Sequence, residues 1–183
     1  MSEETIVNQC APTLAGIKTG NMFSVKYSDE KEILQNIREL NHVLVKKGVR
    51  VIPLQKTSNR ILIYIYRPDY LERDLLHPLA QRILKEKGYE LVSSDRCICQ
   101  LIRNFRNDSE FPHEVGLFLG YPPADVSGFI NSPCEGVKCC GCWKSYSDPE
   151  KAEETFIKYR KCTDILQNMN KQGKTLEQLT VKS

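Results

Sequence analysis

The sequence contains none of the short motifs that identify the common enzyme classes. It has no Walker phosphate-binding loop, no strand-linked G-x-G-x-x-G, no G-x-S-x-G elbow and no H-E-x-x-H helix. ATP hydrolysis, dinucleotide-dependent oxidoreduction, ester hydrolysis and metalloproteolysis therefore lose support. Internal repeats and low-complexity tracts are also missing, so no repeat architecture is expected.

Long apolar runs and a basic leader are missing too. The longest aliphatic runs are strand-sized and end in charged residues, far short of the roughly 18 apolar residues that suggest a membrane span. Residues 1–8 carry acids rather than the basic stretch that begins a secretory signal. We expect a soluble, cytoplasmic protein with reduced thiols and without a membrane partner.

Charge of one sign does not dominate. The formal net charge is +3 and the pI is near 8.4, with acids and bases interspersed along the chain. Nucleic-acid-binding proteins usually concentrate Lys and Arg on one face, so no nucleic-acid partner is expected. Arg96, Arg103 and Arg106 share one face of a predicted helix, which we interpret as a solvated surface rather than a phosphate-binding stripe.

The length and composition fit one globular domain, and the order of elements described next assigns it to the class α+β. With 183 residues, 40% of them hydrophobic, the chain can bury a core that needs no disulfide or metal. We expect one domain over residues 1–173, followed by a short polar tail at 174–183 that contains at most a turn at 176–179.

The order of elements predicts a partial ferredoxin-like arrangement. An alternating strand over 22–27 precedes a helix that starts with the capping pair Asp29 and Glu32 and ends near Gly48. Strands at 49–54 and 60–67 form a hairpin, and a second helix opens at Pro68, is kinked or split by Pro78 and stops at Gly88. This β-α-β-β-α start makes the first two strands parallel and the third antiparallel, in a small mixed sheet covered by helices.

The second half is predicted to be mostly helical. We expect helices over 95–107, 114–119 and 124–130, a late strand over 137–146, and a long helix from Asp148 and Pro149 to about Gly173. The late strand contains the closest group of cysteines in the sequence.

Eight cysteines are present, and three of them lie in the run Cys139-Cys140-Gly141-Cys142 just before Trp143, the only tryptophan. Zinc or iron could be held by Cys139 and Cys142 with Cys134 as a third ligand, but a C-x-x-C unit without a second pair is a weak signal. Alternate residues of a strand point to opposite faces, so Cys139 and Cys142 can chelate together only if a turn or bulge forms at Gly141. Reduced packing cysteines are favoured over metal binding and redox exchange.

Three motifs are similar to those of a known family. They are Cys10-Ala-Pro-Thr-Leu-Ala-Gly-Ile-Lys18, Glu114-Val-Gly-Leu-Phe-Leu-Gly-Tyr-Pro-Pro123 and Cys140-Gly-Cys-Trp-Lys144. Together they resemble an uncharacterised domain family of anaerobic Firmicutes, over nearly the whole chain. The resemblance implies no reaction. It places Cys10, Cys140 and Cys162 on family-like positions but not Cys139 or Cys142, which weakens the metal hypothesis.

A second candidate site joins two of these motifs. Cys10 with Lys18, and Cys140 with Lys144, place an ammonium near a thiol, which favours the thiolate. Cys10, Cys140, Lys18 and Glu114 are the catalytic candidates, and the ligand-binding candidates are Thr13, Tyr121, Trp143 and Lys144. In the alternative interpretation Cys10 packs as a small hydrophobe, Lys18 stays in water and Glu114 complements a helix dipole.

Three functional hypotheses remain. The leading one is a protein that binds a small molecule or metal at a site lined by Cys and Lys. The second is a thiol-dependent enzyme with Cys10 or Cys140 as nucleophile. The third is a non-catalytic adaptor whose Tyr121 and Trp143 meet a protein partner.

Overall fold

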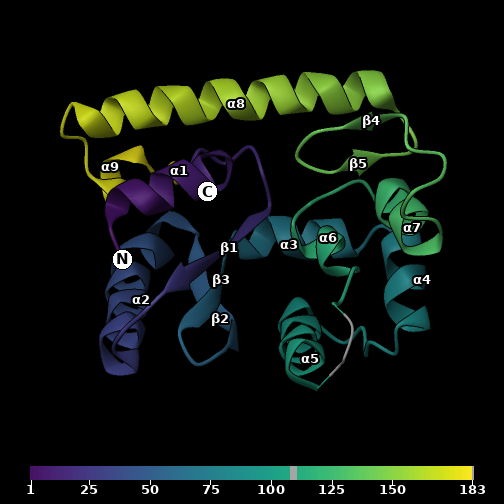
Figure 1. The fold of residues 1–183 in the computed structure, drawn as a ribbon, viewed down its shortest axis with the longest axis horizontal. Helices are drawn as coiled ribbons and strands as arrows, with labels where there is room; N and C mark the ends of the chain where they lie inside the picture. Colours follow the sequence, from purple (N-terminus) through teal and green to yellow (C-terminus); the bar gives the residue numbers. More distant parts are fainter. Residues whose placement is uncertain (108–110, 183) are drawn as a thin grey trace. The chain divides into compact units, whose positions relative to one another are not determined.

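The computed structural model describes residues 1–107 and 111–182 and divides into two compact units. The first unit comprises residues 1–70 and 161–183, and the second comprises residues 71–160 (Figure 1). The domain expected over residues 1–173 therefore draws on both units.

The first unit is built on a three-stranded sheet that follows the predicted order. β1 (Gly20–Lys26) is followed by α2 (Glu30–Leu44), β2 (Arg50–Lys56) and β3 (Arg60–Tyr66). The strand order is β1-β3-β2, and both outer strands run antiparallel to β3. The predicted strand directions are confirmed. The sheet has only antiparallel neighbours, rather than mixed pairing, because β3 separates the two parallel strands.

Asp29 and Gly48 mark the two ends of the helical segment, as predicted. The Asp29 side chain accepts a hydrogen bond from the Lys31 backbone N–H at 2.8 Å, which satisfies one free donor of the first turn. A short 3-10 helix, η1 (Val45–Lys47), follows α2, and Gly48 then adopts a φ of 77° that most residues avoid. Ile33, Ile37 and Leu44 are buried. Their spacing directs one face of α2 toward the core of the first unit.

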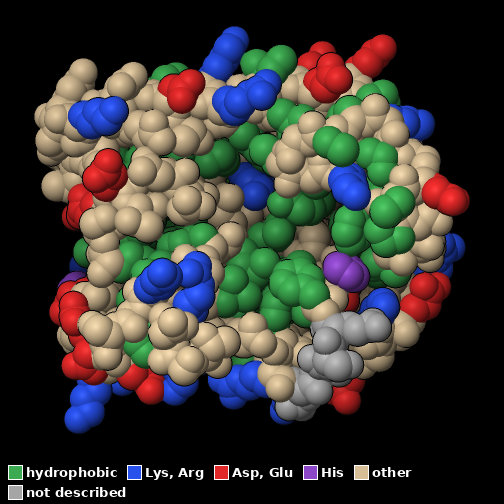
Figure 2. All heavy atoms as spheres, viewed as in Figure 1, with side chains coloured by type: hydrophobic (Ala, Val, Ile, Leu, Met, Phe, Trp, Pro, Cys, Tyr) green, Lys and Arg blue, Asp and Glu red, His purple; other side chains and the backbone are tan. Residues whose placement is uncertain are grey.

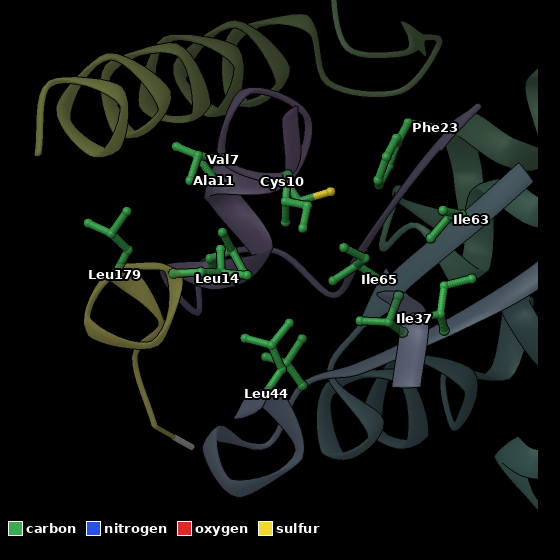
Figure 3. Packing of buried hydrophobic residues seen from close by; sticks show 14 of the residues in the cluster. Val7, Cys10, Ala11, Leu14, Phe23, Ile37, Leu44, Ile63, Ile65 and Leu179 are labelled. Atoms are coloured by element: carbon green, nitrogen blue, oxygen red, sulfur yellow. The ribbon is translucent and has the colours of Figure 1, made fainter. Parts of the chain in front are cut away.

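The N-terminal run forms α1 (Glu3–Leu14), for which no full helix was predicted. Ser2 caps it by accepting from the Thr5 N–H at 3.2 Å, and Pro12 lies within its C-terminal half. Figure 3 shows α1 side chains directed at the core beside β3 and α2. The labelled members of this cluster are Val7, Cys10, Ala11, Leu14, Phe23, Ile37, Leu44, Ile63, Ile65 and Leu179.

The C-terminal segment is packed rather than a free polar tail. The predicted turn at 176–179 is confirmed as α9 (Leu176–Leu179), and both of its leucines belong to the core of the first unit. Arg67 is only 1% exposed. Its guanidinium donates to the backbone oxygens of Thr13, Leu14 and Val181, each at 2.7 Å, and so joins the end of α1 to the last residues of the chain.

The second unit consists of helices and one hairpin. α3 (Pro68–Leu75) leads into it, followed by α4 (Pro78–Glu86), α5 (Ser94–Asn107), α6 (Val115–Phe118) and α7 (Pro123–Asn131). Pro78 splits α3 from α4 as predicted, with the His77 imidazole capping the new helix at the Leu79 N–H. α7 packs against α4, α6 and the hairpin.

The prediction of one continuous late strand over 137–146 is wrong. Residues 139–145 make a two-stranded hairpin, β4 (Cys139–Cys140) and β5 (Lys144–Ser145), which forms a sheet of its own. The chain reverses over residues 141–143, where the Gly141 N–H donates to the Trp143 carbonyl at 3.0 Å. The long helix is confirmed as α8 (Pro149–Lys171), which begins in the second unit and ends in the first.

Charged side chains of both signs are interspersed on the face shown in Figure 2, with hydrophobic side chains between them. Within residues 1–107 and 111–182, no helix combines the length and the apolar character needed to cross a membrane.

Candidate functional site

The hairpin distributes its cysteines between two faces. Cys139 pairs with Ser145, and Cys140 pairs with Lys144. Cross-strand partners share a face and successive residues alternate, so the two pairs lie on opposite sides of the hairpin. Ser145 is fully buried, whereas Cys140 is exposed. We call the side of Cys139 and Ser145 the inner face, and the side of Cys140, Lys144 and Tyr146 the outer face.

Aromatic packing holds the turn of the hairpin. The Trp143 ring stacks on Tyr121 with centroids 5.0 Å apart and meets the edge of Phe156 at 4.6 Å. Gly141 lies so close to Phe156 that a Cβ atom there would overlap the ring. The missing side chain therefore allows α8 to pack directly under the cysteine-rich turn.

Asp125, near the start of α7, anchors the other end of the hairpin. It is 2% exposed. Its Oδ2 accepts from the Trp143 indole N–H at 2.8 Å, while Oδ1 accepts from the N–H of Tyr146 and from both the N–H and the hydroxyl of Ser147. Burial alone would raise the Asp125 pKa, but these hydrogen bonds together hold it below its usual value. The ionised carboxylate thus fixes the hairpin to α7.

The inner-face thiol is engaged with protein groups. The Cys139 Sγ lies 3.8 Å from the Pro149 carbonyl oxygen, at the start of α8. Desolvation, followed by the nearby Glu153 charge, raises the Cys139 pKa. A raised pKa disfavours the thiolate that nucleophilic attack and metal binding need.

The outer face brings a second thiol segment beside Cys140. The Lys144 ammonium donates to the Pro133 carbonyl at 2.8 Å, and the Tyr146 hydroxyl donates to the same oxygen at 3.1 Å. These bonds hold the residue before Cys134 on the outer face. Burial raises the pKa of Tyr146, and the Cys134 and Cys140 thiols add to the rise. Both thiols are exposed.

The Lys144 ammonium also lies over the ring of Phe129, 5.6 Å from its centroid. The Pro133 carbonyl and the Phe129 ring therefore orient this side chain, which extends from β5. Directly opposed residues in an antiparallel pair have Cβ atoms about 5 Å apart. The pairing therefore gives Cys140 a lysine as its cross-strand neighbour, and Pro133 and Phe129 orient the ammonium of that lysine.

Cys10 is in a different environment from Cys140. It is fully buried in the core of the first unit. Desolvation raises its pKa far above the usual range, and the Lys18 charge lowers it by less. Lys18 is itself 6% exposed and not in water. These surroundings favour a neutral packing thiol over the predicted Cys10 nucleophile.

Two other predicted site residues make internal hydrogen bonds. The buried Thr13 hydroxyl donates to Asn21 Oδ1 at 2.8 Å. Glu114, 3% exposed, accepts from the Tyr89 hydroxyl at 2.8 Å and from Asn104 at 3.3 Å. Desolvation, reinforced by the Glu114 charge and hydrogen bond, raises the Tyr89 pKa. These contacts support structural roles for both residues.

The predicted ligands of zinc or iron are divided by the hairpin. Cys139 faces inward, Cys134 lies with the outer face, and Cys142 is in the turn, where its carbonyl accepts from the Tyr121 hydroxyl at 3.1 Å. Across the part of the chain that the structure describes, no three His, Cys, Asp or Glu side chains are arranged to hold a metal ion.

Residues 6–180 match the model of a family described as a protein of unknown function, DUF3793. The chain therefore belongs to this family, which confirms the expectation of an uncharacterised domain family. No curated protein and no solved structure gives a match.

Two residues that matter for the site were not predicted from sequence. Asp125 was expected only as part of a helix, and its partners lie 18–22 residues away on backbone and side-chain groups. Tyr146 was expected on the late strand without a role. A single acidic residue after Pro122 and Pro123 forms no recognisable sequence motif. The contacts of Asp125 with the hairpin therefore become evident only from the fold.

Proposed function

We propose that this protein binds a small anionic, thiol-reactive ligand on the outer face of the hairpin, at Cys140 and Lys144. The observation that carries this proposal is the direct cross-strand pairing of Cys140, which is exposed, with Lys144, whose ammonium is oriented by the Pro133 carbonyl. A thiol supplies affinity for electrophilic centres, and a fixed cation selects ligands that carry negative charge.

The rest of the second unit supports this assignment. Asp125 of α7 and Phe156 of α8 hold the hairpin through its backbone and through Trp143, so Cys140 and Lys144 are presented on a fixed support. Cys10, in contrast, is enclosed by apolar side chains and offers a ligand no exposed sulfur. The enzyme hypothesis, where it is retained, therefore rests on Cys140 alone.

A pair of alkylating agents tests the proposal. Iodoacetate and iodoacetamide transfer similar groups to a thiol, but only iodoacetate carries a negative charge. We expect the ratio of their rates at Cys140, followed by peptide mass spectrometry, to favour iodoacetate over the same ratio at Cys140 in the urea-unfolded protein. The exposed Cys99 of α5, which lies one turn from Arg96 and Arg103, serves as an internal reference between variants. A single charge pair about 4 Å apart in water is worth about 1 kcal/mol, so the expected preference is roughly fivefold.

Lys144→Gln is the decisive variant, because glutamine can still donate to the Pro133 carbonyl but carries no charge. It should abolish the preference at Cys140 and leave the ratio at Cys99 unchanged. Lys151→Gln removes the same charge from the exposed first turn of α8 and should have no effect. If Cys140 shows the same ratio with lysine and with glutamine at position 144, the site has no role in selecting anions.

A further inference from the structure

The outer face holds a second exposed thiol whose role the binding site does not require. Cys134 lies in the segment 132–138, between α7 and β4, which contains no helix or strand. The preceding carbonyl, of Pro133, accepts from both Lys144 and Tyr146. Cys140 is the cross-strand partner of the same Lys144. One lysine thus connects the segments that carry the two thiols.

The remaining cysteines of the cluster are directed elsewhere. Cys139 contacts the Pro149 carbonyl on the inner face. Cys142 lies in the turn beside Tyr121, and its charge contributes to raising the pKa values of Tyr121 and Tyr159. Tyr146, in contrast, is influenced by Cys134 and Cys140. Cys140 also contributes to raising the pKa of its sequence neighbour Cys139, but the Cys139 Sγ contacts Pro149 on the inner face. Cys134 and Cys140 are the two cysteines whose segments Lys144 joins on the outer face.

We propose that Cys134 and Cys140 form a reversible disulfide that closes the binding site. The oxidant is a small anionic disulfide of the glutathione type, which the Lys144 ammonium attracts. Formation of the disulfide does not depend on the proposed function. Its effect does rest on the proposed function, because the oxidised Cys140 can no longer bind a thiol-reactive ligand.

The reaction proceeds by two exchanges. The Cys140 thiolate attacks one sulfur of the small disulfide, a mixed disulfide forms, and one small thiolate leaves and takes up a proton. The Cys134 thiolate then attacks the Cys140 sulfur and expels the second small thiol. Two protein thiols lose two electrons and two protons, and the small disulfide is reduced to two thiols.

The chain between the two cysteines permits this closure. Gly136 has a φ of 75°, a conformation that glycine adopts without strain and that permits a turn between the two cysteines. A bridge requires Cα atoms about 4.4–6.8 Å apart. The Lys138 N–H donates to the Ser145 carbonyl at 2.8 Å and the Pro133 carbonyl accepts from Lys144, so both ends of the segment are held at the hairpin that carries Cys140. The hairpin itself is held by Asp125 and stays in place.

Oxidised glutathione is the probe. The full-length reduced protein is incubated with it anaerobically, quenched with acid, and analysed by intact mass and non-reducing peptide mapping. We expect the wild type to lose two hydrogens and to yield a Cys134–Cys140 linked peptide. Cys134→Ser should instead stop at the first exchange, with one glutathione attached to Cys140. Cys139→Ser and Cys142→Ser should form the same internal bridge as the wild type.

A bridge from Cys140 to Cys139 or Cys142, or a wild type that retains only mixed disulfides, would overturn the proposal. The alkylation ratio keeps this result separate from the proposed function. If the iodoacetate preference at Cys140 is present without the bridge, only the switch is wrong. If the bridge forms without the preference, only the binding of anionic ligands is wrong. After oxidation, alkylation of Cys140 by iodoacetate should disappear and should return with a reductant.

Discussion

Asp125→Asn should release the hairpin from α7, and the hydrogen bonds allow the loss to be worked out. Oδ1 accepts three bonds, from the Tyr146 N–H and the Ser147 N–H and hydroxyl, and Oδ2 accepts one from Trp143. Asparagine has one acceptor oxygen. Its best orientation keeps the three bonds and turns its own NH₂ group toward the indole N–H of Trp143, so two donors face each other.

The magnitudes can be summed approximately. A neutral hydrogen bond contributes about 1 kcal/mol and a charge-assisted one about twice that, so weakening three bonds costs about 3 kcal/mol. Loss of the indole bond adds about 2 kcal/mol. Removing a buried charge returns part of a desolvation penalty of several kcal/mol. We expect a net decrease of about 2–3 kcal/mol in the free energy of unfolding.

Trp143, the only tryptophan, reports the change directly. Urea unfolding followed by its fluorescence should show a lower midpoint for Asp125→Asn, with altered emission in the native state. Asp164→Asn, at an exposed position of α8, is the control and should lie within about 0.5 kcal/mol of the wild type. An Asp125→Asn midpoint equal to that of the control would refute the anchoring role.

The pH dependence has a definite sign. The pKa of Asp125 is lowered on folding, mainly because its hydrogen bonds outweigh the opposing effect of burial. Its contribution to stability is therefore complete above the ordinary carboxyl pKa of about 3.9 and is lost as the pH falls through the lower folded value. The stability difference between wild type and Asp125→Asn should be constant near neutrality and narrow below about pH 4.

Three further changes test the surroundings of the site. Arg67→Met leaves the carbonyls of Thr13, Leu14 and Val181, the first two of them buried, without their donor and should cost about 3–5 kcal/mol in urea unfolding. Arg60→Met, at an exposed strand end, should cost under about 0.5 kcal/mol, and equal losses would contradict the anchoring of the C-terminus. Gly141→Ala places a methyl group against Phe156 and should lower the free energy of unfolding by about 1–3 kcal/mol. The double variant Gly141→Ala/Phe156→Leu should recover this stability. If it does not, overlap with the Phe156 ring is not the cause of the loss. Cys10 should react with iodoacetamide only in step with unfolding, while the exposed Cys99 reacts in the native protein; comparable native rates for both would show that Cys10 is not enclosed.

The first unit shows how far local signals determine a fold. The β1-α2-β2-β3 order could be predicted because apolar periodicity changes from two to 3.6 residues and Gly48 marks the end of the helical segment. α1 could not, because its sequence contains Pro12, Thr13 and Val7, which are weak helix formers. Its helix is stabilised by packing against the core, with Val7, Cys10 and Ala11 fully buried. Packing of this kind is a property of the whole unit.

The same distinction applies to the candidate site. Cys140 and Lys144 were paired on the expectation of one continuous strand, where their spacing places them on the same face. They do share a face, but as opposed residues of two strands, since the chain reverses at Gly141. The reversal brings Gly141 against Phe156 and so depends on where α8 packs. It could not be predicted from the spacing of the cysteines.

Because the chain reverses at Gly141, the face of the hairpin on which a cysteine lies, rather than its closeness in sequence, decides which cysteines can act together. Cys139 and Cys140 are adjacent in sequence, yet one contacts Pro149 on the inner face while the other faces Lys144 on the outer face. Cys134 is six residues from Cys140, yet the Pro133 carbonyl brings its segment to the same lysine. A shift of the hairpin register by one residue would exchange the two faces and remove the ammonium from its thiol. Asp125 and Trp143, which fix that register, are therefore as important to the proposed chemistry as the sulfur atoms themselves.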